Sequence, residues 1–88
     1  MVYHLKQLGE ELRKQLEISY DIKRISRRFY DIYLAGEIEK DELLELIVEY
    51  LCMMELGPEY EYNEIELRTI ANLLIEQKKV ELQEFIKR

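Results

Sequence analysis

Four of the thirteen basic residues fall within positions 23–28, and they are the sharpest candidate for chemistry in the chain. These residues are Lys23, Arg24, Arg27 and Arg28. On a helical wheel they cover about 140° of arc, opposite the apolar residues of the same segment. Cations on one helix face predict a contact for phosphate groups, such as those of nucleic acid or a nucleotide. The alternative is a solvated face with pairs such as Lys23–Asp21 and Arg27–Asp31, or a docking surface for the acidic half of the chain.

The charges are unevenly distributed along the sequence. Residues 1–36 contain seven Lys/Arg and five Asp/Glu, and residues 37–88 contain six Lys/Arg and fourteen Asp/Glu, so the balances are +2 and −8. Together they give the formal net charge of −6. The acidic second part should repel nucleic acid and anionic membrane surfaces. Nucleic-acid binding through residues 23–28 is therefore the alternative hypothesis and not the leading one.

Two stretches have the spacing of a known motif but lack the side chains that the motif requires. Gly36 could supply the turn of a DNA-reading helix-turn-helix, but the helix that follows is almost wholly apolar or acidic and offers no base-reading cations. The stretch 31–42 has the glycine spacing of a calcium-binding EF-hand loop. Two of its ligand positions are Tyr33 and Ala35, which have no carboxylate. We expect neither DNA reading by that helix nor a calcium site.

No other group of residues has the composition of a reaction centre. Glu42, Glu45 and Glu49 line one helical strip, but carboxylate iron sites also need histidines three residues after a glutamate, and the sole histidine is His4. Cys52 lies one turn from Glu49, whose charge disfavours the thiolate, so we expect a poorly reactive cysteine. We predict no enzyme activity, no cofactor and no metal site.

An acidic, tyrosine-bearing segment is the predicted partner-binding surface. Its residues are Glu59, Tyr60, Glu61 and Tyr62. Tyrosine is enriched at protein interfaces, because its ring is apolar and its hydroxyl is polar. The alternative is that both rings fold back over the preceding helix and close the bundle.

Five further residues raise the same choice between core and surface. They are Tyr30, Tyr33, Tyr50, Met53 and Met54. We expect the three tyrosines in the core or at its edge. The two methionines could line an adaptable groove, but filling of the core is favoured.

Apolar residues at spacings of three and four predict helices over most of the chain. One stripe begins at Leu5 and predicts a helix over about residues 2–18, and a second begins at Ile22 and runs to about Ala35. At 100° per residue the two stripes point about 110° apart, so we predict a turn near residues 19–21. Gly36 then ends the second helix in a left-handed conformation.

The next predicted helix, residues 40–56, is apolar on nearly all sides except for its strip of glutamates. Such a helix must be covered by its neighbours, so we expect it at the centre of the core. Gly57 and Pro58 end it. Asn63 with Glu66 forms a capping-box pattern that starts a fourth helix. That helix either continues to the C-terminus or gives way to a short fifth helix near Val80.

The predicted fold is therefore all-α: one domain, residues 1–88, forming a compact bundle of four helices and an optional fifth around the apolar helix 40–56. The expected function is a non-enzymatic protein–protein interaction or regulatory module, an acidic helical adaptor or inhibitor with a basic partner. Self-association as a homodimer would hide apolar surface that short helices cannot cover. The longest apolar stretch is far shorter than a membrane span, and one cysteine suits a reducing compartment, so we expect a cytoplasmic protein without membrane contact.

Overall fold

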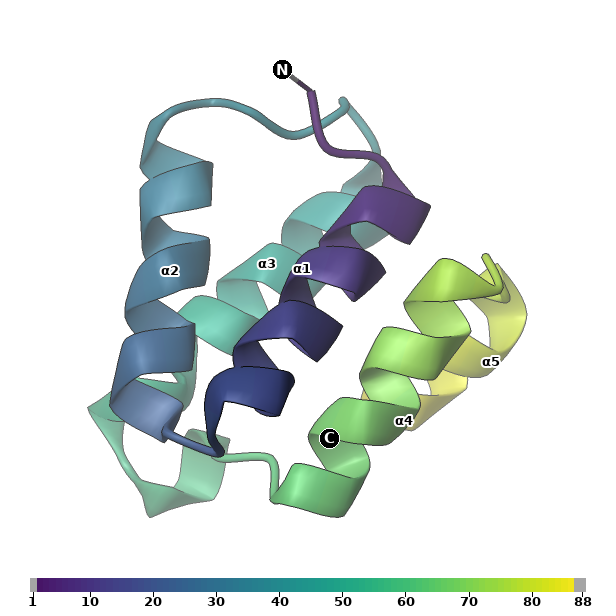
Figure 1. Cartoon of the computed structure of the whole chain (residues 1–88). Helices are drawn as coiled ribbons and strands as arrows, with labels where there is room; N and C mark the ends of the chain where they lie inside the picture. The colour runs from purple at the N-terminus through teal and green to yellow at the C-terminus, as the bar shows by residue number, and fades with distance from the viewer. Residues whose placement is uncertain (1, 87–88) are drawn as a thin grey trace.

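The computed structural model describes residues 2–86, and in that range it contains five α-helices, two short 3-10 helices and no β-strand (Figure 1). The elements are α1 (Leu5–Ile18), α2 (Ile22–Leu34), α3 (Glu42–Met53), η1 (Met54–Leu56), η2 (Pro58–Tyr60), α4 (Glu64–Ile75) and α5 (Lys79–Ile86). The predicted all-α bundle is confirmed, and the fifth helix is separate.

Short polar side chains begin three of the helices. The Asp21 carboxylate accepts a hydrogen bond from the N–H of Arg24, and the Asp41 carboxylate accepts from the N–H groups of Leu43 and Leu44. Asn63 forms the predicted capping box with Glu66. Each cap satisfies N–H groups that have no partner within the helix, which is why these helices begin where they do.

The first helix begins later than its apolar stripe predicts. Tyr3 is extended instead, its N–H donating to the carbonyl of Glu37 at 2.6 Å and its carbonyl accepting from the N–H of Glu39 at 3.0 Å. His4 caps α1 together with Gln7. These contacts hold residues 2–4 against the loop between α2 and α3 as an isolated bridge to Ile38.

Two left-handed residues end α2 and α4. Gly36 has φ +66°, and its N–H donates to Tyr33 while the N–H of Glu37 donates to Ile32. The same pattern of hydrogen bonds recurs around Gln77, which has φ 56°. Both are Schellman endings, and the one at Gln77 separates α5 from α4.

The helix predicted at 40–56 is shorter than expected. It is α-helical from Glu42 to Met53 and tightens into the 3-10 turn η1 before Gly57. Five of its side chains, at positions 43, 44, 47, 48 and 51, are buried in the core. Its outer side is not fully covered, because Leu46 is 38% exposed and both Tyr50 and Met53 are half-buried.

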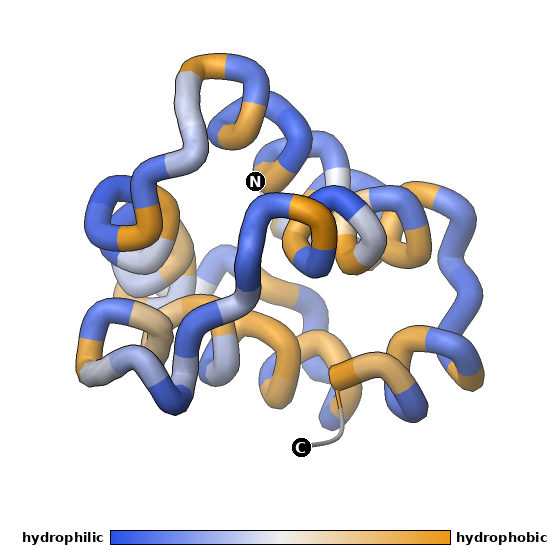
Figure 2. The backbone as a smooth tube through the Cα atoms, turned by 90° about the horizontal axis from the view of Figure 1, so that it is seen from below, coloured by the Kyte–Doolittle hydropathy of each residue, from blue (hydrophilic) through white to orange (hydrophobic). Residues whose placement is uncertain are grey.

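The helices pack chiefly as two pairs, α1 against α4 and α2 against α3 (Figure 1). Hydrophobic and hydrophilic residues alternate along each helix, as expected for helices with one buried face (Figure 2). α1 approaches α4 closely at Gly9, where a Cβ atom would lie 2.8 Å from the carbonyl oxygen of Ala71. The core therefore draws on all five helices.

Candidate functional site

The four cations of α2 are divided between two sides of the helix. Arg24 turns toward α1, where its guanidinium donates to the carbonyl oxygens of Gln15 (3.0 Å) and Ser19 (2.7 Å) and to the side-chain oxygen of Gln15. These carbonyls lie at the C-terminal end of α1, where the carbonyl groups have few N–H donors within the helix. Arg24 therefore serves to join α1 to α2.

Arg28 also turns toward α1. Its Nε lies 3.3 Å from the Glu11 carboxylate, and its Nη2 donates to the Tyr3 hydroxyl at 3.1 Å. Burial lowers the pKa of Arg28, but the hydrogen bonds and charge of Glu11 and Tyr3 outweigh it, so the pKa is raised. Arg28 is thus held as a cation in an internal contact.

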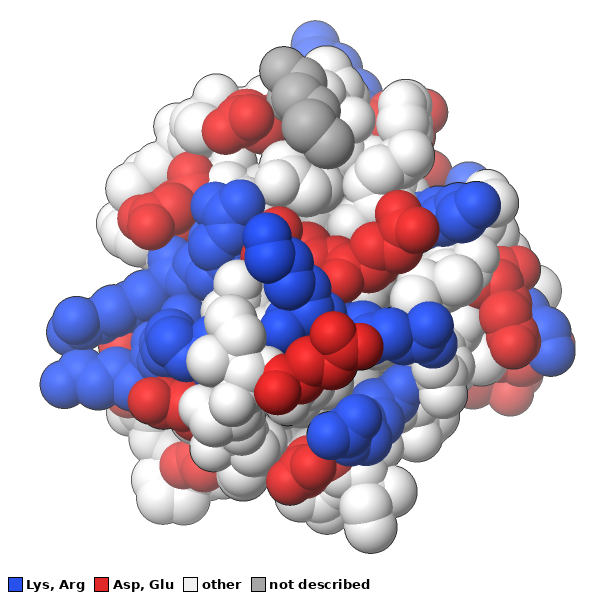
Figure 3. All heavy atoms as spheres, in the orientation of Figure 1, with Lys and Arg blue, Asp and Glu red and all other residues white. Residues whose placement is uncertain are grey.

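Lys23 and Arg27 remain on the outer side of α2. Arg27 lies 3.5 Å from the Glu55 carboxylate, and both residues are exposed. Asp21, a possible partner of Lys23 in the alternative interpretation, caps α2. Figure 3 shows Lys and Arg side chains gathered over α1 and α2 with Asp and Glu among them. The four cations do not form one free face as predicted, because two of them are bound to α1.

The acidic, tyrosine-bearing segment is only partly on the surface. Glu59 and Glu61 are exposed and Tyr60 is half-buried, but Tyr62 is only 3% exposed. The Tyr62 hydroxyl lies 3.5 Å from the carbonyl oxygen of Ile86 in α5. Tyr62 therefore closes the bundle, as the alternative interpretation held, and is not available to a partner.

Tyr20 attaches the same segment to the start of α2. Its hydroxyl donates to the carbonyl oxygen of Tyr62 at 2.9 Å. Burial, followed by the charges of Glu61, Glu64 and Glu66, raises the pKa of the Tyr20 hydroxyl. A phenol near these carboxylates therefore stays protonated and keeps its role as a donor.

Two tyrosines that we expected in or beside the core lie on the surface. Tyr30 is 48% exposed and Tyr33 is 43% exposed. Together with Glu49, Cys52 and Met53 they line a hollow of about 200 Å³ between α2 and α3. We call this surface the tyrosine face. Met53 thus lines a groove, whereas Met54 is fully buried and fills the core.

Cys52 lies in this face with its thiol half-buried. Burial first, and then the charges of Glu49 and Glu55, raise its pKa to about 11. The predicted low reactivity follows, although desolvation contributes more than the neighbouring carboxylate that suggested it.

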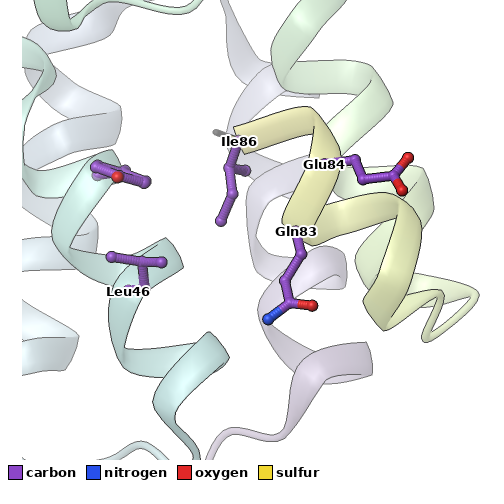
Figure 4. Close-up of a pocket in the computed structure, with 5 residues that line it drawn as sticks. Leu46, Gln83, Glu84 and Ile86 are labelled. Atoms are coloured by element: carbon purple, nitrogen blue, oxygen red, sulfur yellow. The ribbon is translucent and has the colours of Figure 1, made fainter. Parts of the chain in front are cut away.

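A larger hollow of about 420 Å³ lies on the opposite flank of α3, beside α5. It is lined by Leu46, Tyr50, Gln83, Glu84 and Ile86, and we call it the α3–α5 groove. In Figure 4 Ile86 and Gln83 point from α5 toward α3, while Glu84 points away from Leu46. At the start of α3 the Lys79 ammonium lies 3.0 Å from the Asp41 carboxylate and ties the two helices together.

Two glutamates of α3 have no oppositely charged partner among the described residues. Glu42 and Glu49 flank Leu46 on α3, both are exposed, and neither belongs to an ion pair within residues 2–86. Of these glutamates, Glu49 lines the tyrosine face, whereas the carboxylate among the residues that line the α3–α5 groove is that of Glu84.

No group of three or more His, Cys, Asp or Glu side chains among residues 2–86 could hold a metal ion. His4 instead lies 2.7 Å from the Glu39 carboxylate. Among the described helices none has the length and apolar character to cross a membrane.

Comparisons with protein-family models, with curated proteins and with solved structures give no significant match. Any function must therefore be inferred from the geometry of the chain.

Sequence reasoning did not identify the residues that line the two hollows as a surface. Leu46 and Tyr50 belong to a helix that is apolar nearly all round, and that excess of apolar residues was the available signal. Gln83 and Ile86 carry no such signal, because their position beside α3 depends on the turn at Gln77.

Proposed function

We propose that the chain is a protein-binding module, an adaptor or regulatory subunit that acts by binding and not by catalysis. The α3–α5 groove is its binding surface. The observation that carries this proposal is the groove itself, a hollow of about 420 Å³ in which Leu46, Tyr50 and Ile86 lie beside exposed Glu84. Grooves of this kind receive the apolar side of an amphipathic helix.

The negative charge near the groove indicates the charge of the partner. Exposed Glu84 lines the groove, exposed Glu42 precedes Leu46 by one turn of α3, and the chain as a whole carries a formal charge of −6. Complementary charge raises association rates and excludes partners of the wrong sign. We therefore infer a partner that offers a basic amphipathic helix, with leucine-like side chains toward Leu46 and Tyr50.

A designed peptide tests this proposal directly. The probe is a helix of about 18 residues with leucines on one side and lysines on the other, long enough to be helical in water. We expect it to bind, measured by fluorescence anisotropy, and to bind more weakly as salt is added. Leu46→Ser should weaken binding about tenfold, because it removes an apolar contact from the groove.

Ile65→Ser is the matched control. Ile65 is 77% exposed on α4, away from the groove, so its replacement should leave the affinity unchanged. A matched peptide with glutamates in place of lysines should not bind. Equal binding of both peptides, or equal loss in the Leu46 and Ile65 variants, would contradict the proposal.

The nucleic-acid alternative has lost two of its four contacts. Arg24 and Arg28 are held by α1, and Arg27 is paired with Glu55. A labelled oligonucleotide is therefore expected not to bind at about 50 mM salt. Binding that is abolished by Lys23→Glu with Arg27→Glu would restore that alternative.

A further inference from the structure

A neutral polar side chain lies among the apolar residues of the α3–α5 groove. Gln83 points from α5 toward α3, as does Ile86 three residues later, and Leu46 lies on the α3 side (Figure 4). Residues three apart on a helix are neighbours on its surface. A partner helix that contacts both Leu46 and Ile86 must therefore also cover Gln83.

The Gln83 amide has unused hydrogen-bonding capacity. The side chain is exposed, and no group among residues 2–86 forms a hydrogen bond with it. An amide offers both a donor and an acceptor, which water satisfies while the residue is exposed. A partner that covers the amide with leucine removes this hydration and leaves both groups unpaired, which weakens the complex.

The neighbouring Glu84 does not create the same requirement. Its side chain points away from Leu46 (Figure 4) and is exposed, so a helix seated between Leu46 and Ile86 does not have to cover it. Its charge attracts any basic helix, whatever the sequence of the apolar side of that helix. Gln83 is therefore the residue that can distinguish one basic amphipathic helix from another.

We propose that Gln83 determines the specificity and register of the α3–α5 groove, by pairing with one asparagine or glutamine on the apolar side of the bound helix. A second amide supplies the donor and the acceptor that Gln83 lacks. A single amide within an apolar helix interface also fixes the register, as buried asparagines do in coiled coils. This inference rests on the proposed function and adds the side chain that the partner must carry.

Two peptides and one variant test the pairing. The first peptide is the leucine–lysine helix described above, and the second replaces one central leucine by asparagine. Fluorescence anisotropy gives the affinity of each for the wild-type chain and for Gln83→Leu. We expect the preference for the asparagine peptide to fall about tenfold in Gln83→Leu, because the peptide amide then has no partner.

The same variant should gain affinity for the leucine peptide. Gln83→Leu removes the unpaired amide and adds an apolar contact, so this peptide should bind more tightly than it does to the wild type. A misfolded variant could not give such a gain. Circular dichroism checks that the helical content is unchanged, as expected for two residues of similar helix propensity.

Glu84→Gln is the matched control on α5. Loss of this charge should weaken the binding of both lysine-bearing peptides alike and leave their ratio unchanged. Added salt should act in the same way, because it screens the lysines but not the contact between two neutral amides.

The inference is overturned if Gln83→Leu leaves the ratio of the two affinities unchanged, or if Glu84→Gln or salt changes that ratio as much as Gln83→Leu does. In either case binding of both peptides would leave the proposed function intact. If neither peptide binds the wild-type chain, the proposed function fails, and the inference fails with it.

The two failures are therefore distinguishable.

Discussion

Gly9 shows how one residue sets the distance between two helices. Glycine inside a helix costs about 1 kcal/mol relative to alanine. Glycine is nevertheless required at this position, because a Cβ atom would lie 2.8 Å from the Ala71 carbonyl oxygen and from the Ile75 amide nitrogen. Both of these are backbone atoms of α4, which cannot rotate away as a side chain would. The close contact of α1 with α4 therefore depends on the absence of a side chain.

Replacing Gly9 by alanine should destabilise the fold despite the better helix propensity. We expect the free energy of unfolding to fall by about 1–2 kcal/mol, because overpacking forces α1 and α4 apart. Thermal denaturation should show this as a decrease of about 4–16 °C in Tm. Glu10→Ala, at an exposed neighbouring position, is the control and should change little. A more stable Gly9→Ala variant would contradict the close approach.

For single residues, the sequence predicted the chemical character of a side chain better than its burial. The neighbouring Glu49 predicted that the pKa of Cys52 is raised, and the structure bears out that direction, although burial contributes more than the charge. Tyr30 was expected in the core or at its edge but is exposed, and Tyr62 was assigned to a binding surface but is buried, as the alternative for it held. Tyrosine suits both environments, so its composition alone could not separate them.

Helix ends are the elements that local sequence specifies best. Asp21, Asn63 and Gly36 each act through hydrogen bonds to residues within a few positions, so their effect is visible without the rest of the fold. The end of α4 was left open because Gln77 adopts a left-handed conformation that glycine favours. Packing of Leu82 and Ile86 in the core stabilises this turn, and that contact is not local.

The N-cap of α3 predicts how stability depends on pH. The hydrogen bond from Lys79, ahead of those from Leu44 and Leu43, holds the pKa of Asp41 below its usual 3.8. A lowered pKa in the folded state means that this contribution is present above pH 4 and is lost as the pH falls through the lowered value. We therefore expect the free energy of unfolding to decrease on acidification below about pH 4.

Two substitutions of Asp41 separate its cap from its charge. Asp41→Ala should cost about 1 kcal/mol at neutral pH, because the N–H groups of Leu43 and Leu44 lose their acceptor. Asp41→Asn keeps an acceptor and should cost less, while reducing the loss of stability in acid. Urea denaturation at neutral and acidic pH measures both. If Asp41→Asn shows the same acid response as the wild type, Asp41 does not contribute to it.

On the scale of the whole molecule, the sequence predicted the number and type of elements but not their pairing. Periodicity shows that a helix has a buried side, but it does not show which helix covers it. The pairs α1–α4 and α2–α3 arise from contacts such as Gly9 with Ala71 and Ser26 with the Cys52 carbonyl, at 2.5 Å. The pairing of the helices therefore determines which apolar side chains stay exposed.

The same limit applies to the candidate binding surface. The excess of apolar residues over 40–56 indicated that some would remain exposed, and a homodimer was one expected consequence. Only the arrangement of α2 and α5 beside α3 divides that excess into a tyrosine face and an α3–α5 groove.

The central claim is that the α3–α5 groove receives a basic amphipathic helix, and NMR mapping of the peptide-binding surface tests it most directly. In a titration of the ¹⁵N-labelled chain with the leucine–lysine peptide, amide shifts should concentrate at Leu46, Tyr50, Gln83 and Ile86. Amides of α1 and of the cations at 23–28 should stay in place. Shifts that centre on α1 and α2, or no shifts at saturating peptide, would contradict the account.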